Sequence, residues 1–434
     1  MHIFRYDSPR FRTQMKALSR RAAAAPEVVE TVREILAAVS VRGNAAVLEY
    51  TAKFGGLEMK RGAMRVTAAE FKEADANTTD NVKVALSLAH ENVRSFARRG
   101  LRKSWRGRNR QGVEVGETFH PFQRVGIYVP GGNAPLVSTA IMTVTLAAAA
   151  GVPEIVVATP ADAHGRLHPP LLYALQLAGA TEVYRIGGAQ AIAAMAHGTR
   201  TIAPVTKIFG PGNAYVVEAK RQVFGIVGID LLPGPSEILI IADRTADPAW
   251  IAADLLAQAE HGHGSVVLLT DSEPLLGSVR EALRLQMAGA TRGEHLARVV
   301  GDTLYLVLVE KLADAVAIAN DFAPEHVVIS ARQEEQLAES ILTAGAIFLG
   351  RWSPVSGGDF VAGPSHELPT GGSGKSFSGL TVDQFQRRTS IVRFDEKSLR
   401  KSLQAIETIS AIEGLDRHGA SAAIRLATGS QPFQ

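Results

Sequence analysis

The spacing of hydrophobic residues divides the chain into stretches of different character. Between residues 14 and 100, apolar side chains recur at helical intervals, for example at Val28, Val32 and Ile35, and this periodicity predicts amphipathic helices. From Arg124 onward, short runs of Val and Ile alternate with helical stretches and are separated by glycines. This alternation predicts βαβ units, which build parallel sheets.

Two successive series of βαβ units follow from this pattern. The first series predicts strands at 125–129, 154–159, 182–186 and 207–209, and helices near 136–150, 168–178, 189–196 and 213–224. The second series predicts strands at 238–242, 265–270, 304–309, 326–330 and 346–349, and helices near 248–259, 275–288, 311–321 and 332–343. The expected fold class is therefore α/β, with two parallel-sheet units side by side and a helical N-terminal region.

The last part of the chain follows a separate pattern. Residues between Asp359 and Gly379 are rich in Gly and Ser, and after them a helical tail carries one apolar face. That face consists of Leu399, Leu403, Ile406, Ile409 and Ile412. The pattern predicts no strands in the tail, so we expect its apolar face to pack against another surface.

The amino-acid composition restricts the chemistry available to this protein. The 434 residues include no cysteine, which excludes thiolate nucleophiles, cysteine-ligated zinc fingers and iron–sulfur clusters. A bound metal would therefore need nitrogen and oxygen ligands. The oxidation of an aldehyde would have to pass through a hydrate formed from water, because no thiol can form a thiohemiacetal.

Nothing in the sequence resembles a membrane span or an export signal. The longest apolar stretch, residues 138–153, contains three threonines and is shorter than the ~20 apolar residues of a bilayer span. The first residues are basic, but no apolar run ends at a small-residue cleavage site. We therefore expect a cytoplasmic protein with no membrane partner.

The formal net charge of +3 conceals one basic segment, residues 94–110, in which eight of seventeen residues are Lys or Arg. A nucleic-acid surface is one interpretation, and a solvated helix face followed by a turn is the other. Only Phe96 and Trp105 could stack on bases, and no nucleic-acid-binding motif is present. We favour the solvated face and expect no nucleic-acid partner.

Three glycine-containing loops in the first series could hold the phosphates of a nucleotide. They are Tyr128-Val129-Pro130-Gly131-Gly132-Asn133, Gly187-Gly188-Ala189-Gln190 and Phe209-Gly210-Pro211-Gly212-Asn213. Each follows a predicted strand and precedes a predicted helix, where backbone amides can approach a phosphate. One such loop could reflect backbone geometry alone, but three in one sheet favour a dinucleotide site. None has the complete G-x-G-x-x-G sequence, so we expect an incomplete Rossmann-like unit.

Four clusters of ionisable residues lie at loop junctions in the second series and in the tail. They are Gln258 with His261 and His263, Glu325 with His326, Asp359 with His366, and Glu413 with His418. Gln258 and His261 share one helix face, although two histidines near a helix end are more often solvent-exposed than metal ligands. Glu325 and His326 could transfer protons near neutral pH, or they could form a surface turn.

Taken together, these motifs resemble the histidinol dehydrogenase family from end to end. The matching segments are Tyr-Val-Pro-Gly-Gly, Gly-Gly-Ala-Gln-Ala, Phe-Gly-Pro-Gly-Asn-Ala-Tyr, Gly-Pro-Ser-Glu-Ile-Leu, Gln-Ala-Glu-His, Ala-Pro-Glu-His-Val, Gly-Pro-Ser-His-Glu-Leu-Pro-Thr and Glu-Gly-Leu-Asp-Arg-His. The resemblance implies an enzyme that oxidises L-histidinol to L-histidine through the aldehyde, as the last step of histidine biosynthesis. It also implies one Zn²⁺ per subunit and two molecules of NAD per turnover.

The resemblance implies a role for individual residues. The zinc ligands would be Gln258, His261, Asp359 and His418. Glu325 and His326 would form the catalytic acid/base pair. NAD would be contacted by Tyr128, Gln190 and Asn213. The substrate would be contacted by Ser236, His366 and Glu413, together with His326 and the four zinc ligands.

The resemblance further implies a domain division and a homodimer with exchanged segments. Residues 1–23 would form an N-terminal helical arm, 24–127 and 236–380 the zinc and substrate domain, 128–235 the Rossmann-like NAD domain, and 381–434 the tail. The tail, with Glu413 and His418, would complete the active site of the partner subunit.

One part of the pocket rim departs from the family pattern. In Gly363-Pro364-Ser365-His366-Glu367, many members have Asn before the His and an apolar residue after it, and residues 372–378 are also unusual. One alternative is therefore the same chemistry on a different amino- or sulfo-alcohol. Another is a non-catalytic metal- or nucleotide-binding protein, which the Glu325–His326 pair argues against.

Overall fold

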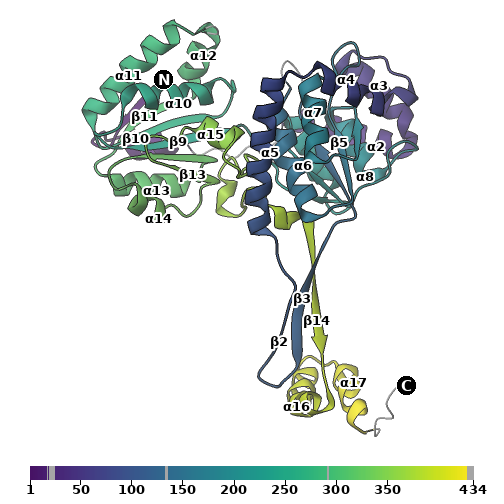
Figure 1. Cartoon of the computed structure of the whole chain (residues 1–434). Helices are drawn as coiled ribbons and strands as arrows, with labels where there is room; N and C mark the ends of the chain where they lie inside the picture. The colour runs from purple at the N-terminus through teal and green to yellow at the C-terminus, as the bar shows by residue number, and fades with distance from the viewer. Residues whose placement is uncertain (17, 19–24, 132–134, 291–292, 428–434) are drawn as a thin grey trace. The chain divides into compact units, whose positions relative to one another are not determined.

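The computed structural model describes residues 1–16, 18, 25–131, 135–290 and 293–427. The chain divides into two compact units. The core unit contains Met1–Gly100 and Phe122–Phe385, and the arm unit contains Leu101–Pro121 and Gln386–Gln434. The core unit holds two separate parallel sheets, each with helices packed on it (Figure 1), which confirms the predicted α/β class.

The first of these sheets has six strands in the order β1-β11-β10-β9-β12-β13. Their bounds are β1 (His2–Arg5), β9 (Glu237–Ala242), β10 (Ser265–Thr270), β11 (Leu304–Leu308), β12 (His326–Ser330) and β13 (Ala346–Leu349). Every residue of the four central strands is buried, because helices cover both faces of the sheet. This explains their almost continuous runs of Val, Ile and Leu.

Alternate residues of each central strand face opposite helical layers. Ile238 and Ile240 pack with α10 (Pro248–Ala259), α11 (Glu273–Ala288) and α12 (Gly293–Thr303). Leu239 and Ile241 pack on the other face with α1 (Phe11–Lys16), α13 (Leu312–Phe322) and α14 (Glu334–Glu339). The short helix α15 (Val355–Phe360) follows β13 and adds Val355 to the first layer.

The second sheet has five strands in the order β6-β5-β4-β7-β8. Their bounds are β4 (Arg124–Tyr128), β5 (Glu154–Ala158), β6 (Glu182–Tyr184), β7 (Lys207–Phe209) and β8 (Gly228–Ile229). The connecting helices are α6 (Val137–Ala150), α7 (Pro169–Ala178), α8 (Gly188–His197) and α9 (Ala214–Val223). All strand pairs are parallel, as the alternation of strands and helices predicts.

The N-terminal helices pack on this second sheet. They are α2 (Pro26–Arg42), α3 (Asn44–Gly55), α4 (Ala68–Asn77) and α5 (Asp80–Gly100). Val32, Ile35 and Val39 of α2 share one hydrophobic core with residues of α8 and α9, and α5 packs on α6. The packing thus joins these helices to the five-stranded sheet, whereas the predicted division grouped 24–127 with 236–380.

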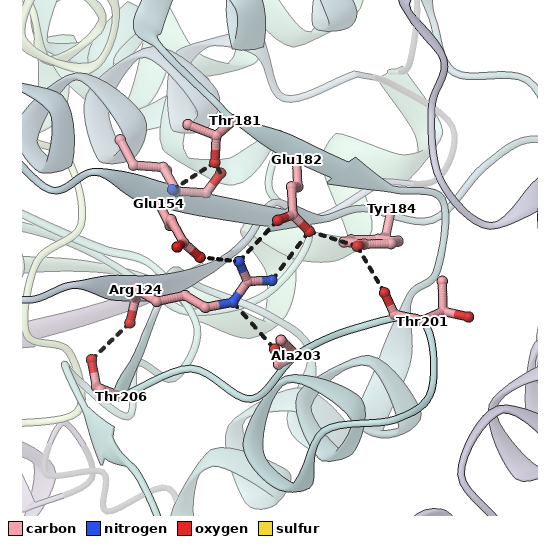
Figure 2. A network of polar contacts seen from close by, with 9 residues as sticks. Arg124, Glu154, Thr181, Glu182, Tyr184, Thr201, Ala203 and Thr206 are labelled. Carbon is pink, nitrogen blue, oxygen red and sulfur yellow. Dashed lines mark hydrogen bonds and ion pairs between the residues drawn. The ribbon is translucent and has the colours of Figure 1, made fainter.

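A network of charged and polar groups ties together the amino ends of three neighbouring strands (Figure 2). Arg124, the first residue of β4, pairs with Glu154 at the start of β5, at 2.5 Å, and with Glu182 at the start of β6, at 2.9 Å. The hydroxyl of Tyr184 donates a hydrogen bond of 2.6 Å to Glu182 and lies 3.1 Å from the carbonyl oxygen of Thr201. Only 12% of the Arg124 side chain is exposed, so water competes little for these contacts. The contacts hold the first residues of β4, β5 and β6 side by side and thereby favour one register of the three strands.

The arm unit is an antiparallel sheet of three strands followed by two helices. The strands β2 (Trp105–Arg108), β3 (Glu114–Pro121) and β14 (Gln386–Arg393) lie in the order β14-β3-β2. The helices are α16 (Glu396–Ile412) and α17 (Asp416–Ala427). The predicted absence of strands from the tail is therefore wrong, because β14 pairs with a segment more than 250 residues earlier in the chain, and residue spacing does not reveal such a partner.

The spacing predicted the strands of the two βαβ series to within a few residues, except the two-residue strand β8, which it missed. It also missed β1, which the prediction of a helical N-terminal arm excluded. His2–Arg5 instead pairs in parallel with β11 at the edge of the six-stranded sheet. The remaining short helices are η1 (Arg61–Ala63), η2 (Ser373–Lys375) and η3 (Val382–Phe385). A search of the described residues finds no helix long and apolar enough to span a membrane.

Replacing Arg124 should destabilise the core unit without rearranging it. Arg124→Met leaves Glu154 and Glu182 without their shared cation, so we expect the free energy of unfolding to fall by about 2 kcal/mol. This loss is smaller than that for a fully buried ion pair, because water reaches part of the network. Chemical denaturation would measure this loss. Arg284→Met, which breaks an exposed pair with Glu281, should leave the free energy of unfolding unchanged, because water screens this pair. Equal losses in the two variants would contradict the role given to Arg124.

Candidate active site

Most of the predicted site residues gather at the amino ends of the strands of the six-stranded sheet. Glu237 begins β9 and His326 begins β12, and the two strands pair directly. Gln258 lies in the last turn of α10, and His261 follows that helix before β10 begins. Ligands of doubly wound sheets usually bind at the carboxyl ends of the strands. This cluster lies at the opposite edge, at the amino ends.

A sharp turn of the backbone delivers Glu325 and His326 to this edge. Ala323 ends α13 in the left-handed conformation, with φ of 52°, and is fully buried. Such a conformation is costly for a residue with a Cβ atom, so the surrounding packing must hold it. Pro324 follows, and β12 then starts at His326.

The backbone N–H and C=O of a single residue, Glu237, hold both members of the acid/base pair. Its N–H donates to Oε2 of Glu325 at 2.8 Å, and its carbonyl oxygen lies 3.1 Å from Nδ1 of His326. Since a carbonyl oxygen can only accept, Nδ1 carries the proton. Nδ1 is also 3.6 Å from Oε2 of Glu325. Both side chains are at least nine-tenths buried, so the surface-turn interpretation of this pair is wrong.

The second ring nitrogen of His326 points toward Asp359 of α15. Nε2 lies 3.4 Å from Oδ1 of Asp359 and makes no hydrogen bond within the described part of the chain. Burial lowers the pKa of His326, but the neighbouring carboxylates of Asp359 and Glu325 outweigh this effect, so the net shift is upward. Burial raises the pKa of Glu325 to about 7, against the opposing effect of His326.

Gln258 and His261 bring amide and imidazole groups to the same cluster. Gln258 is 4% exposed, and its Nε2 has no hydrogen-bond partner among the described residues. Burial lowers the pKa of His261, while Asp359 raises it and His326 lowers it. The charge of Asp359 and that of His326 thus act on His261 in opposite directions.

His366 links this cluster to the helices of the five-stranded sheet. Its Nδ1 lies 3.0 Å from the backbone oxygen of Asp359, and its Nε2 lies 3.1 Å from the hydroxyl of Thr139 in α6. Glu367 is 6% exposed, and its Oε1 lies 3.4 Å from the same Nε2. Thr139 is in the first turn of α6, so the contact reaches the edge at which β4 ends.

Ser236 lies directly before β9 and beside the start of β10. A Cβ atom at Gly264 would lie 1.8 Å from the backbone oxygen of Ser236, so only glycine permits this close approach. On the other side of the same segment, Oε1 of Glu237 accepts a hydrogen bond of 3.2 Å from the N–H of Gly371. The segment is thus fixed between β10 and the glycine-rich loop.

The predicted nucleotide loops border a separate cavity of about 370 Å³ at the five-stranded sheet. Tyr128, Gln190 and Asn213 all line this cavity, beside Gly131 and the turn at Gly187–Gly188. The N–H of Gly188 donates to the Tyr128 hydroxyl at 3.1 Å. Asn213 caps α9 through its side-chain oxygen, which leaves its amide nitrogen for a ligand. Gly132 and Asn133 of the first loop lie outside the described residues.

Glu413 and His418 lie in the arm unit and not in the core unit. Glu413 follows α16, His418 is in the first turn of α17, and both are exposed. Within the described residues, no group of three or more His, Cys, Asp or Glu side chains is arranged to hold a metal. Of the four predicted ligands, the core unit contributes three, and one of these is a glutamine.

Sequence reasoning missed the organising role of Glu237 and the contact of Thr139. Glu237 belongs to the motif Gly-Pro-Ser-Glu-Ile-Leu, whose match signalled importance without indicating a role. Thr139 lies in an apolar helix and carries no signal of its own. Its partner, His366, is more than 200 residues away in the chain.

Comparisons with known proteins agree with this geometry. The sequence profile of the family described as histidinol dehydrogenase matches residues 18–426. The histidinol dehydrogenase of Agrobacterium fabrum is 45% identical over 410 residues, which cover 94% of this chain and 95% of that protein. That of Syntrophotalea carbinolica is 41% identical over 429 residues, which cover 98% and 99%.

A solved structure shows the same fold over the whole length. The crystal structure of histidinol dehydrogenase from Elizabethkingia anophelis superimposes with a TM-score of 0.94 at 32% identity, and the match covers 99% of this chain and 98% of that one. Family profile, sequence identity and structure therefore agree, and the chain belongs to the histidinol dehydrogenase family, oxidoreductases that catalyse the final step of histidine biosynthesis.

Proposed function

We propose that this protein oxidises L-histidinol to L-histidine through the aldehyde in the cytoplasm, with zinc bound in the site and two molecules of NAD as electron acceptors. The observation that carries the proposal is the buried Glu325–His326 pair, which the backbone N–H and C=O of Glu237 hold while Nε2 of His326 faces Asp359. Such a pair provides a carboxylate and an imidazole whose proton affinities suit acid/base work near neutral pH.

The donor set of the cluster fits zinc. Gln258, His261 and Asp359 offer one oxygen, one nitrogen and one carboxylate, and His418 would supply the fourth ligand, so no thiolate is needed. The buried amide nitrogen of Gln258 lacks a hydrogen-bond partner among the described residues, so no bond from that nitrogen fixes the amide, and its oxygen can turn toward a ligand. When bound, zinc would orient the amine and imidazole of the substrate.

The residues of this chain would move protons in both oxidation steps. His326 would take the hydroxyl proton of histidinol while the carbinol hydride passes to NAD, which yields the aldehyde. Glu325 would then take a proton from water as the water oxygen bonds to the aldehyde carbon, and His326 would return its proton to the aldehyde oxygen, which gives the hydrate. His326, again neutral, would take a hydroxyl proton from the hydrate while the hydride passes to a second NAD, and the carboxylic acid formed loses its proton to give the carboxylate.

The cavity beside Tyr128, Gln190 and Asn213 is the proposed NAD site. It opens at the carboxyl ends of β4 and β7, between which the strand order reverses, and this is the usual position of a nucleotide in such sheets. The hydrogen bond between His366 and Thr139 connects the acid/base cluster to the first turn of α6 at that same edge. This contact supports a substrate position close to the cavity, as direct hydride transfer from the substrate to NAD requires.

The charge near His366 favours an amino alcohol over a sulfo-alcohol. Glu367 adds a buried carboxylate 3.4 Å from the His366 ring. A buried negative charge attracts the ammonium or imidazolium group of histidinol and repels a sulfonate. Glu367 therefore supports the histidinol assignment, although its sequence position departs from the family pattern.

We also propose a homodimer in which the arm unit completes the partner's site. The arm carries Glu413 and His418. It exposes Ile409 and Ile412 of α16, at 56% and 80% of their surface, and Leu415 of the turn that follows, at 41%. Exposed apolar side chains at the end of a helix and in the next turn indicate a contact surface. Each active site would then combine core residues of one chain with His418 of the other.

The metal assignment predicts that His261→Ala and Asp359→Ala lose zinc and activity together. Removing one of four ligands leaves the ion weakly held, while the two sheets keep the fold intact. Elemental analysis would measure zinc, and circular dichroism would confirm folding. His263→Ala, which removes an exposed neighbouring histidine outside the ligand set, should retain the metal. Full zinc occupancy in His261→Ala or Asp359→Ala would remove that residue from the ligands.

The role of Glu325 predicts a variant that stops after the first oxidation. Water is needed only after the aldehyde forms, so a single turnover of Glu325→Gln should release about one NADH per histidinol, against two for the unaltered enzyme. Aldehyde oxidation by the unaltered enzyme should rise with pH until Glu325 has lost its proton, near its pKa of about 7, and the variant should lack this rise. His326→Asn is the matched control and should slow both steps by roughly a hundredfold.

Equal rates with added histidinaldehyde for Glu325→Gln and the unaltered enzyme would refute the role of Glu325. If the unaltered enzyme forms no NADH from histidinol but does so from another alcohol, the substrate assignment fails while the chemistry stands.

The composite site predicts complementation between two inactive variants. When His418→Ala and His326→Ala chains are co-expressed, about half of the dimers are mixed, and one site of each mixed dimer receives an intact core and an intact arm. Activity should therefore recover to about a quarter of the unaltered level. The pair His418→Ala and Glu413→Ala should not complement, because every arm carries a defect. Absence of recovery in the first pair, with mixed dimers present, would place His418 in the site of its own chain.

A further inference from the structure

The loop that joins β7 to α9 is sterically restricted at its first residue, Gly210. Gly210 has φ of 105°, and a Cβ atom there would lie 2.1 Å from the backbone oxygen of Tyr128. The loop therefore passes directly against the end of β4. Only glycine can occupy this position, because the space and the backbone angle both exclude a side chain. Asn213 and Tyr215, just beyond, line the proposed NAD cavity.

Both polar groups of the Gly210 backbone are bound by buried side chains. The N–H of Gly210 donates to Oδ2 of Asp230 at 2.7 Å, and its carbonyl oxygen accepts from Nζ of Lys220 at 2.7 Å. Lys220 and Asp230 also form an ion pair with each other, and their side chains are 0% and 3% exposed. The three residues form a closed ring of contacts that water does not reach.

The ion pair connects the loop to the elements on both sides of it. Lys220 lies in α9, seven residues after the cap Asn213, and Asp230 directly follows β8. Asn213 accepts hydrogen bonds from the N–H groups of Tyr215 and Val216. The loop is thus anchored to α9 at both of its ends. A displacement of Gly210 would shift the Asn213 amide that faces the cavity.

A buried ion pair is an inefficient way to stabilise a fold. Well-packed apolar side chains in the same volume often give equal or greater stability. We therefore look for a role of the ion pair other than stability. The pair orients two backbone groups, the N–H and the C=O of Gly210. At this position the strand pairing of β7 has ended, so neighbouring strands do not satisfy these two groups.

We infer that Lys220 and Asp230 are positioning residues for NAD. They hold the backbone of the loop 209–213 in the position in which Asn213 and Tyr128 can contact the dinucleotide together. The inference rests on the proposed NAD site. It assigns no contact with NAD to Lys220 or Asp230, because both side chains are buried and neither lines the cavity. Their effect on the cofactor passes through the backbone of Gly210.

Equilibrium binding of NAD to the purified full-length protein, measured by calorimetry without substrate, tests the inference. Lys220→Met should raise the dissociation constant of NAD by at least about tenfold, since misplacement of a binding loop by an ångström has effects of this size. The zinc content and the KM for histidinol at saturating NAD should stay within about twofold of the unaltered values, because the acid/base cluster lies on the other sheet.

Arg124→Met is the matched control for loss of stability. It breaks a partly buried ion network in the same sheet, but at the amino ends of the strands, opposite to the cavity. It should lower the melting temperature as Lys220→Met does, and leave the dissociation constant of NAD within about twofold. A tenfold weakening in Arg124→Met as well would show that general destabilisation causes the effect, and would overturn the inference.

The double variant Lys220→Met with Asp230→Leu separates positioning from stability. Replacing both charges removes the unpaired buried ion and should recover most of the melting temperature, but it leaves Gly210 without its two side-chain partners. Weak NAD binding by this stable variant is the expected result. NAD binding equal to that of the unaltered protein would overturn the inference, and absence of NAD binding by the unaltered protein would instead refute the NAD site itself.

Discussion

The candidate active site depends on the backbone of one residue, Glu237. Its N–H donates to the Glu325 carboxylate at 2.8 Å, and its C=O accepts from the His326 ring at 3.1 Å. Both side chains are buried, and buried polar groups must find partners or lose several kcal/mol. The first residue of a central strand can meet this need, because its neighbours in the sheet fix its position. The pairing between β9 and β12 therefore also fixes the positions of the two acid/base side chains.

The same requirement explains the placement of charge elsewhere in the core unit. Arg124 joins Glu154 and Glu182 at one end of the five-stranded sheet, and Lys220 joins Asp230 at the other. The first network fixes strand register, and the second fixes a loop beside the cavity. Buried charges contribute little net stability once their desolvation is counted, so their value lies in the single geometry that they enforce.

The sequence predicted those parts of the fold that follow from neighbouring residues. Strands β9, β10 and β12 were recognisable because strands buried on both faces carry nearly continuous apolar runs. Residues with a distant partner were not recognisable. The strand β14 pairs with β3 across more than 250 residues, and His366 meets Thr139 across 227. No periodicity within either segment reflects such a partner.

The sequence alone therefore determined the α/β class, the two βαβ series, the chemistry permitted without cysteine and the residues that could perform it. These properties depend on residue type and on spacing along the chain. Only the tertiary structure decided that α2–α5 cover the five-stranded sheet, that Glu237 holds Glu325 and His326, and that Gly210 is bound by Lys220 and Asp230. The reason is that contact, burial and proton affinity are properties of positions in space, which segments far apart in the chain create together.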